Sequence, residues 1–356
     1  MNIPHYTKIH NRFKLNGFHF SAEELKEIGY DFIKESIPYE MAIGDFIMDW
    51  MDKYDHINVK TSVSTGDSKI IKISKQAMVS SAIRTGNFFN VKIGDSALHC
   101  LPADFIAGKM MLVRAMVLGL SLELVEPNSF PMENLYKTYD FVAMTPMQAK
   151  NSLNQLHQIK TLIIGGAPIF PDLNKKLVER HQNCFETYGM TETITHIVAS
   201  KLAVPKKPFK ALDGIHLEVD REGCLVVYAP DITDKPIQTN DFVHLHDSEN
   251  FTYLGRRDNV IISGGVKIFP EVVERKLADN IEIPFFVYGI PDKVLGEKLV
   301  LVVEGEEPQL RELKLNQTSL KGLDKFEVPK EILYVSKILR NNGKYLREKT
   351  INTFNN

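Results

Sequence analysis

Cysteine is scarce in this sequence and charge is balanced, and each of these features removes a class of protein. The 356 residues include three cysteines, Cys100, Cys184 and Cys224, which lie far apart and form no CxxC or Cys/His pattern. A disulfide framework and a zinc site are therefore excluded, and we expect reduced thiols in a cytoplasmic protein. Lys and Arg number 43 against 45 Asp and Glu, so no basic excess is present to bind nucleic acid or an anionic membrane. A small, nucleotide-like partner is the better expectation.

Long apolar runs are also missing. The most apolar stretch, residues 110–125, is interrupted by Arg114 and Glu123, which predicts a buried helix followed by a strand rather than a membrane span. Residues 1–17 are polar and mildly basic and lack the apolar segment of a signal peptide. The chain is nevertheless 44% hydrophobic, which is enough for a sizeable core, and its length favours two domains.

Strand-like and helical segments alternate between about residues 57 and 200. The pattern predicts a helix over 106–118 and further helices after Pro146 and Pro171. The predicted strands are residues 96–101, 120–125, 141–145 and 161–164. Such alternation is typical of a mostly parallel α/β sheet, whose ligands bind at the carboxyl ends of the strands.

The pattern of predicted strands and helices changes twice in the rest of the chain. Short alternating strands with tight turns run from Ile215 to Tyr253, and a new series of strands and helices begins after Asp258. We predict an α/β fold with a large N-terminal domain, residues 1–257, that includes a small β subdomain at about 212–254. A mobile C-terminal α+β domain would cover residues 258–356, with strands at 285–292 and 298–305 and then a helical, charged tail.

The segment TSVSTGDSK, from Thr61 to Lys69, is rich in hydroxyl groups and contains one Gly and one Lys. Hydroxyls and backbone N–H groups in a turn can hold phosphate oxygens, and a lysine adds a positive charge. The GxxxxGK[ST] pattern is absent, which excludes a P-loop NTPase. By itself, the segment also suits an ordinary polar surface loop.

This segment resembles the phosphate loop TSG[ST]TGxPK of the adenylate-forming enzymes, the family of acyl- and aryl-CoA synthetases, luciferases and adenylation domains. The shared residues are Thr61, Ser62, Ser64, Thr65, Gly66 and Lys69. Val63 and Ser68 stand where the family has Gly and Pro, and a β-branched Val disfavours the positive φ angles open to Gly. The resemblance, which extends to about Arg347, implies ATP binding and conversion of a carboxylate into an acyl-adenylate.

Three later segments resemble the nucleotide site of the same family. They are Gly165-Gly166-Ala167-Pro168, similar to the adenine-binding turn, Tyr188-Gly189-Met190-Thr191-Glu192, similar to YGxTE, and Thr239-Asn240-Asp241, similar to TGD. The resemblance implies that Tyr188 stacks on adenine, that Thr191 meets the α-phosphate and that Asp241 binds the ribose hydroxyls. It also implies that Glu192 holds Mg²⁺, a role that suits a carboxylate oxygen.

The C-terminal motifs imply a hinge and a catalytic lysine. Gly255-Arg256-Arg257-Asp258 resembles GRxD, so Arg256 would contact the ribose and phosphates and Asp258 would be the hinge. By resemblance, the thiol tunnel for coenzyme A involves Gly264, Gly265 and Lys267. Gly343, Lys344 and Arg347 match P[RK]TxxGKxxR, which makes Lys344 the candidate that stabilises charge on the carboxylate and α-phosphate. Outside that context, Lys344 would be read as a surface lysine in a turn.

The choice of acid depends on residues 103–119. This segment resembles the O-succinylbenzoate–CoA ligases of menaquinone biosynthesis within the family, with Gly108 and Arg114 in place and Phe105 where a His is usual. A guanidinium on an apolar helix needs an anion, and the second carboxylate of a dicarboxylic aromatic acid would supply it. A structural salt bridge is the alternative for Arg114. Met190 is assigned to the same acid site.

The combined interpretation is an AMP-forming ligase that uses ATP, Mg²⁺ and coenzyme A to convert O-succinylbenzoate into its CoA thioester. A homodimer is compatible with it. Three alternatives stay open. The acid could be another aryl or fatty acid, with CoA or a carrier protein as the thiol; the chain could be a non-catalytic nucleotide-binding relative, as Val63 and Ser68 suggest; or it could be an α/β module unrelated to ATP.

Overall fold

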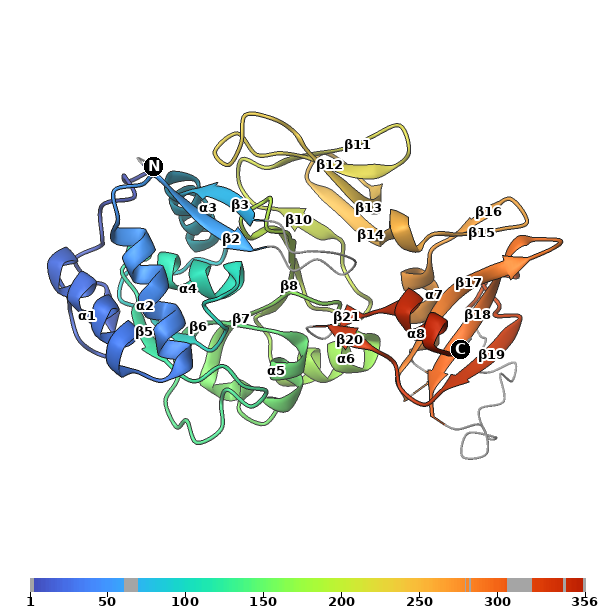
Figure 1. Ribbon diagram of the computed structural model, residues 1–356, viewed down its shortest axis with the longest axis horizontal. Helices are drawn as coiled ribbons and strands as arrows, with labels where there is room; N and C mark the ends of the chain where they lie inside the picture. Colours follow the sequence, from blue (N-terminus) through green and yellow to red (C-terminus); the bar gives the residue numbers. More distant parts are fainter. Residues whose placement is uncertain are drawn as a thin grey trace.

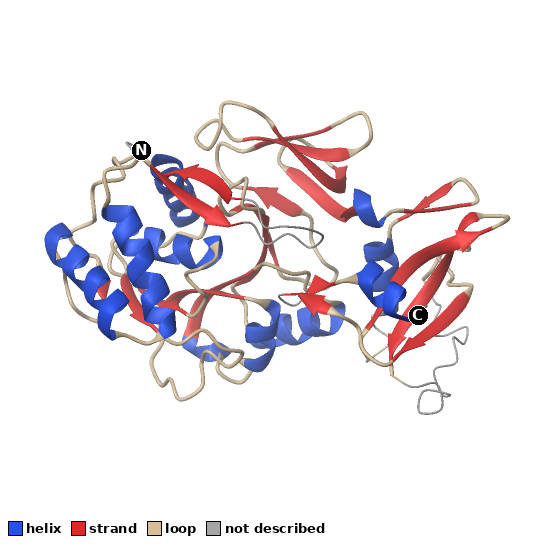
Figure 2. Cartoon of the chain, in the orientation of Figure 1, coloured by secondary structure: helices blue, strands red, loops and turns tan. Residues whose placement is uncertain are grey.

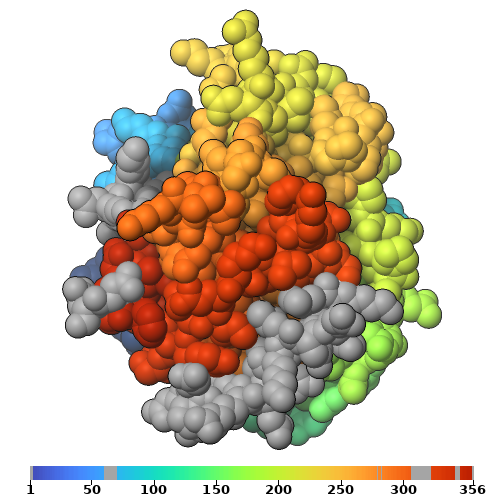
Figure 3. All heavy atoms as spheres, turned by 90° about the vertical axis from the view of Figure 1, so that its right-hand side faces the viewer, coloured from blue at the N-terminus to red at the C-terminus, as the bar shows by residue number. Residues whose placement is uncertain are grey.

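The computed structural model describes residues 3–60, 70–278, 280–281, 283–305, 322–341 and 344–354. These residues form a large sheet with helices on both of its faces, followed by a smaller sheet built from the C-terminal part (Figures 1 and 2). Figure 3 shows the second part, in orange and red, facing the viewer in front of the first. The predicted α/β class is confirmed by this architecture. The division into domains at residues 257 and 258 stays a prediction.

The first half of the large sheet is parallel, as the strand–helix alternation predicts. Its strands, in spatial order, are β1 (Lys14–Leu15), β5 (Ser121–Leu124), β4 (Ser96–His99), β6 (Tyr139–Met144), β7 (Ile159–Ile164) and β8 (Cys184–Gly189). The chain passes from β4 to β5 on one side and then returns to β6 on the other. Ligands bind beside the carboxyl ends of the strands at such a reversal.

The second half of the large sheet is antiparallel and contains the predicted β subdomain. From β8 outward the strands are β9 (His196–Lys201), β10 (Phe209–Ala211), β14 (Asn250–Arg256), β13 (Ile237–Leu245), β12 (Cys224–Tyr228) and β11 (His216–Val219). Hydrogen bonds join β9 to β8 and β10 to both β9 and β14. The subdomain strands therefore continue the parallel sheet, and β8 belongs to both halves.

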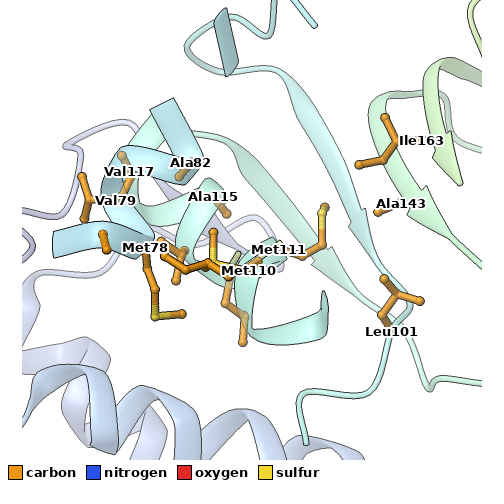
Figure 4. Close-up of a cluster of buried hydrophobic side chains, with 14 of the residues drawn as sticks. Met78, Val79, Ala82, Leu101, Met110, Met111, Ala115, Val117, Ala143 and Ile163 are labelled. Carbon is orange, nitrogen blue, oxygen red and sulfur yellow. The ribbon is translucent and has the colours of Figure 1, made fainter. Parts of the chain in front are cut away.

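Two groups of helices cover the two faces of the sheet. The first group is α1 (Ala22–Glu35), α2 (Pro38–Met51), α3 (Lys75–Phe88) and α4 (Ile106–Leu118), and the second is α5 (Pro146–Asn151) and α6 (Pro171–Arg180). Alternate residues of β6 serve the two cores, since Phe141 packs in one cluster and Val142 in the other. Figure 4 shows Met78 of α3 beside Met110 and Met111 of α4 in the first cluster.

Helix α4 has the bounds that the sequence predicts, and it ends where Gly119 adopts a left-handed conformation with φ of 74°. It is apolar all round and buried along most of its length, as expected of a core helix. None of the helices in the described ranges is both long enough and apolar enough to span a membrane.

The segment before α1 is hydrogen-bonded to α4 and β5. His10 N–H donates to the carbonyl of Met116 at 2.8 Å, and β1 pairs in parallel with β5, with Lys14 opposite Ser121. The Asn16 side chain then accepts a 2.8 Å bond from the N–H of Leu124. Residues far apart in the sequence thus fix the position of α4 jointly.

The smaller sheet is formed by β16 (Val266–Ile268), β15 (Ile261–Ser263), β18 (Gly296–Glu304), β17 (Phe285–Asp292) and β19 (Glu331–Val335). One face packs against α7 (Pro270–Leu277) through Val273 and Leu277, and Ile351 of α8 (Arg347–Phe354) packs on the other. The hairpin of β20 (Arg340–Asn341) and β21 (Lys344–Tyr345) precedes α8.

Two 3-10 helices and a separate hairpin complete the description. The short 3-10 helices are η1 (Leu156–Gln158) and η2 (Arg257–Asn259), and a separate hairpin is formed by β2 (His56–Lys60) and β3 (Ile70–Ser74). The prediction of a purely helical tail is wrong, because β19 and the β20–β21 hairpin lie between β18 and α8. The apolar segment Glu331–Val335 gains its partners from β18, which is distant in the sequence.

Candidate active site

The adenine-turn candidates lie at the carboxyl edge of the parallel strands. Strand β7 leads directly into Gly165, whose N–H donates to the carbonyl of Met144 at the end of β6, at 3.1 Å. A Cβ at Gly165 would lie 2.6 Å from Oγ1 of Thr187 on β8, so this turn lies close against β8. The turn continues through Gly166, Ala167 and Pro168, which are exposed or half-buried.

The turn that follows β8 is fixed by Thr193. Its hydroxyl donates to the carbonyl of Met190 at 3.0 Å and lies 2.8 Å from the carbonyl of Thr195, while Met190 N–H donates to the hydroxyl at 2.9 Å. A Cβ at Gly189 would lie 2.2 Å from the carbonyl oxygen of Thr195, so only glycine fits there. The tight turn leaves Thr191 half-buried and Glu192 exposed.

Tyr188 and Asp241 meet although 53 residues separate them in the chain. The Tyr188 hydroxyl donates to Oδ2 of Asp241 at 2.5 Å, and Asp241 is only 6% exposed. Burial, and then the neighbouring Asp241, raise the pKa of Tyr188, so its hydroxyl stays protonated as a donor. Burial also raises the pKa of Asp241. The Tyr188 ring packs edge-on against Phe251, with centroids 5.7 Å apart.

Arg256 and Asp258 lie next to this pair. Asp241 of β13 is opposite Arg256 of β14 in the strand register, and Arg256 Nη2 is 3.2 Å from Oδ2 of Asp258. Both Arg256 and Asp258 are exposed, so a ligand can reach the pair. Three of the motifs predicted from the sequence, YGxTE, TGD and GRxD, are therefore brought together by β8, β13 and β14.

Arg114 is a buried cation without an anion. Its side chain is among the largest fully buried ones, and it forms no ion pair within the described residues. Its Nη2 donates to Oγ1 of Thr195 at 3.0 Å and Nη1 approaches Sδ of Met111 at 3.5 Å, whereas Nε has no partner. Burial lowers the pKa of Arg114 to about 9, so the guanidinium is still charged at neutral pH. The salt-bridge alternative thus finds no support in the described residues.

His196 follows Thr195 in the chain and is the first residue of β9. Its Nε2 is 3.1 Å from Oγ1 of Thr85, and the residue is buried. Burial, followed by the positive charges of Arg114 and Arg84, lowers the pKa of His196 well below its usual value. His196 is therefore neutral and adds no second positive charge beside Arg114.

The other predicted residues belong to the C-terminal part of the chain or lie outside the description. Gly264 and Gly265 form the exposed β15–β16 turn with φ of 58° and 81°, and Lys267 Nζ is 5.1 Å from the ring centroid of Phe242. Lys344 is placed in β21, opposite Asn341. The phosphate-loop candidates Thr61, Ser62, Ser64, Thr65, Gly66 and Lys69 lie outside the described residues, between the paired ends Lys60 of β2 and Ile70 of β3.

Sequence reasoning missed three residues that the structure places in the site. Thr195 and His196 directly follow the YGMTETI run, and Tyr253 of β14 packs its ring 6.0 Å from that of Tyr188. Thr195 and His196 could have been found from the sequence, because they are a polar pair at the start of the otherwise apolar strand THIVAS. Nothing local distinguishes Tyr253, because its partner comes from another strand.

Two other features lie away from this site. A cavity of about 340 Å³ is found at the opposite, amino edge of the parallel strands, lined by residues such as Phe89, Lys160 and Phe185, and none of the predicted site residues borders it. Across the part of the chain that the structure describes, no cluster of three or more His, Cys, Asp or Glu side chains could hold a metal ion.

Comparison with known proteins agrees with this geometry. Residues 60–214 match the family model described as AMP-binding enzyme. An acyl-CoA synthetase (AMP-forming)/AMP-acid ligase II-like protein from Dyadobacter fermentans is 32% identical in sequence. Its structure aligns over 92% of this chain and 98% of its own, with a TM-score of 0.61.

Two further relatives have more specific names. A 2-succinylbenzoate–CoA ligase of Bacillus cytotoxicus is 24% identical over 81% of this chain and 68% of its own. The O-succinylbenzoate coenzyme A synthetase of Bacillus subtilis, in complex with ATP and magnesium ion, is 19% identical. Its structure aligns over 93% of this chain and 77% of its own with a TM-score of 0.71, which shows a shared fold.

Proposed function

The chain belongs to the family of AMP-binding enzymes, and on that premise we propose that it is an AMP-forming ligase that joins O-succinylbenzoate to coenzyme A. The observation that carries the choice of acid is Arg114, a buried guanidinium at the end of the Tyr188–Thr195 turn for which the described residues supply no counter-charge. A buried cation of this kind is costly unless an anion joins it. The names of relatives such as the Bacillus cytotoxicus ligase support the same acid.

A dicarboxylic acid would satisfy both requirements of the site. One carboxylate has to reach the nucleotide, on the side where Thr191 and Glu192 are presented. The other would pair with Arg114, whose planar guanidinium suits a carboxylate. Because Thr195 Oγ1 is bonded to Arg114 and lies in the same turn as Thr191, one turn would position both ends of the acid. We assign half-buried Met190 to the wall between them.

The residues present fit a bound adenine nucleotide. Asp241 offers a carboxylate fixed by Tyr188, and its second oxygen would accept from the ribose hydroxyls, with exposed Arg256 beside it for the ribose and phosphates. The turn Gly165–Pro168, which lies against β8, would approach the flat base together with Tyr188 and Gly189. The loop from Thr61 to Lys69, carried by the β2–β3 hairpin, would bind the phosphates.

Exposed Glu192 is the proposed protein ligand for Mg²⁺. A single carboxylate is sufficient, because Mg²⁺ commonly takes its remaining ligands from substrate phosphates and water. This fits the absence of a metal-binding cluster from the described residues. When bound, the ion would neutralise phosphate charge as pyrophosphate departs.

The reaction would have two halves. In the first, a carboxylate oxygen of the acid attacks the α-phosphorus of ATP, the bond to the β-phosphate oxygen breaks, and pyrophosphate leaves. Lys344 would stabilise the negative charge that develops there. In the second half, the thiolate of coenzyme A attacks the acyl carbon and AMP leaves. We propose a rotation about Asp258 between the halves, which exchanges Lys344 for the Gly264-Gly265 turn and Lys267.

ATP–pyrophosphate exchange with a panel of acids tests this function. We expect exchange with O-succinylbenzoate, and thioester formation when coenzyme A is added. Exchange only with fatty acids or simple benzoates would refute the choice of acid while leaving the ligase. ATP binding without exchange with any acid would refute the ligase and favour a non-catalytic nucleotide-binding protein.

A further inference from the structure

One short segment joins the C-terminal part of the chain to β13 and β14. This docking segment, residues 267–275, runs from β16 through α7. The Phe269 ring meets that of Phe242 edge-on with centroids 5.3 Å apart, and Lys267 Nζ lies over the same ring. Farther along, Arg275 Nη2 donates to the backbone carbonyl of Tyr253 at 3.0 Å. All three contacts cross the proposed domain boundary at residues 257 and 258.

Glu271 brings the docking segment against the GRRD motif. A Cβ at Gly255 would lie 2.3 Å from Oε2 of Glu271, so glycine is required for this approach. The other carboxylate oxygen accepts from Nδ2 of Asn259 at 2.5 Å. In the strand register Gly255 is opposite Phe242, and Arg256 is opposite Asp241. The docking segment therefore lies directly behind the carboxylate proposed to hold the ribose.

The other end of α7 is tied to the residues that follow Lys344. Arg347, the first residue of α8, binds Glu274 in a bidentate manner, with Nη1 at 2.6 Å from Oε1 and Nη2 at 3.0 Å from Oε2. Val287 N–H also donates to Oε1 of Glu274, at 2.8 Å. Helix α7 is thus a rigid link between the β20–β21 hairpin, which carries Lys344, and the β13–β14 pair.

We propose that Arg275 is a positioning residue for adenylate formation, holding the C-terminal domain in the arrangement that serves the first half-reaction. The proposal rests on the proposed function. The Arg275 guanidinium faces the carbonyl of Tyr253 and the negative charges of Glu186, Glu271 and Glu274. Glu186 and Tyr253 lie before the boundary, whereas Glu271 and Glu274 lie after it. A rotation about Asp258 would break the bond to Tyr253 and release Lys267 from Phe242.

The test separates the two half-reactions. Arg275→Met keeps an apolar stem but removes the charged donor, and loss of a charged hydrogen bond corresponds to about a tenfold or larger effect. We expect pyrophosphate exchange to fall about tenfold or more, while thioester formation from supplied acyl-adenylate stays at the wild-type rate. Arg275→Lys, which retains charge and a donor, should recover part of the exchange.

The matched control is Lys276→Met. Lys276 is the next residue of α7 but pairs with Glu327 at 2.5 Å, on its own side of the boundary. We expect neither half-reaction to change. Equal loss of both half-reactions in Arg275→Met, or the same loss of exchange in Lys276→Met, would overturn the proposal.

Distances between spin labels test whether Arg275 holds the two parts together, and this measurement needs no acid substrate. The three cysteines of the chain are buried, so spin labels can be directed to Tyr136→Cys and Val294→Cys, positions that are 89% and 88% exposed on the two parts. We expect one main distance in the otherwise wild-type protein and a loss of that population in Arg275→Met but not in Lys276→Met. An unchanged distribution in Arg275→Met would overturn the proposal. If the wild type exchanges pyrophosphate with no acid, the proposed function fails while this measurement still decides the role of Arg275.

Discussion

Replacing Arg114 with Met distinguishes an arginine that binds a ligand from one that supports the fold. In the structure its guanidinium is buried and charged, with Thr195 and Met111 as its neighbours. Methionine has a similar length and removes a charge that no described carboxylate balances. We therefore expect the free energy of unfolding of Arg114→Met to be unchanged or higher. Removing one partner of a buried salt bridge would instead cost about 3–5 kcal/mol.

The same substitution should damage acid recognition. A hydrogen bond to a charged group contributes about 1.5–3 kcal/mol, and about 1.4 kcal/mol corresponds to a factor of ten. We expect kcat/KM for O-succinylbenzoate to fall by about 10- to 150-fold. The decisive comparison uses the monocarboxylic analogue that keeps the reacting carboxylate and lacks the other one. The analogue that lacks the carboxylate bound by Arg114 should be used equally well by wild type and variant.

Arg84→Met is the matched control. Arg84 is also buried, at 5% exposure, but it has partners: Nε donates to the carbonyl of Asp213 at 2.6 Å, and Nη2 is 3.2 Å from Oδ2 of Asp231. We expect this variant to lose about 1–3 kcal/mol of stability and to keep its preference among acids. The reasoning would be refuted if Arg114→Met were destabilised to the same extent as Arg84→Met, or lost activity equally with O-succinylbenzoate and with the monocarboxylic analogue.

Three further predictions concern catalysis, nucleotide binding and acid stability. Lys344→Ala should abolish pyrophosphate exchange yet still convert supplied acyl-adenylate to the thioester, and equal loss of both steps would contradict its assignment. Asp241→Asn leaves one side-chain oxygen for the Tyr188 hydroxyl and replaces the other with an NH2 group, which cannot accept from the ribose hydroxyls. KM for ATP should therefore rise about tenfold while KM for the acid is unchanged; a matching rise for the acid would argue against a ribose contact. Burial lowers the pKa of His99 from 6.5 to about 4. Between these pH values the unfolded state binds a proton at His99 that the folded state does not bind. The free energy of unfolding should therefore fall as the pH is lowered from about 6.5 to 4. Denaturant titrations at pH 7 and pH 4 should show a decrease in the free energy of unfolding that approaches about 3 kcal/mol. The decrease should be smaller in His99→Gln. An equal decrease in wild type and His99→Gln would show that other groups are responsible.

Local features of the chain were predictable because local physics sets them. The helix over Ile106–Leu118 follows from its apolar composition and from Gly119, which adopts the left-handed conformation that ends it. The strand Phe285–Asp292 follows from a β-branched and aromatic run. Arg114 could be singled out in the same way, since a charge on an apolar helix is visible in the sequence.

Features that depend on distant partners were not predictable in this way. The hydrogen bond between Tyr188 and Asp241 depends on β8 and β13 being joined in one sheet through β9, β10 and β14, which no window of sequence reveals. Strand β19 was missed for a similar reason, because its parallel partner β18 is distant in the chain. The partnership of Arg114 with Thr195 likewise joins a helix to a loop 81 residues later. The roles of Lys344 and of the loop Thr61–Lys69 stay predictions.

The N-terminal strand has a consequence for how acid recognition could be lost. Helix α4, which carries Arg114, receives a hydrogen bond from His10, and a Cβ at Gly119 would lie 2.4 Å from Nδ1 of the same histidine. Proteolytic removal of residues 1–16 would therefore release the helix on the acid side, while Tyr188 and Asp241 would keep their own strand partners. A trimmed chain should retain ATP binding and lose discrimination among acids, which would show that the first residues act on specificity without contacting the substrate.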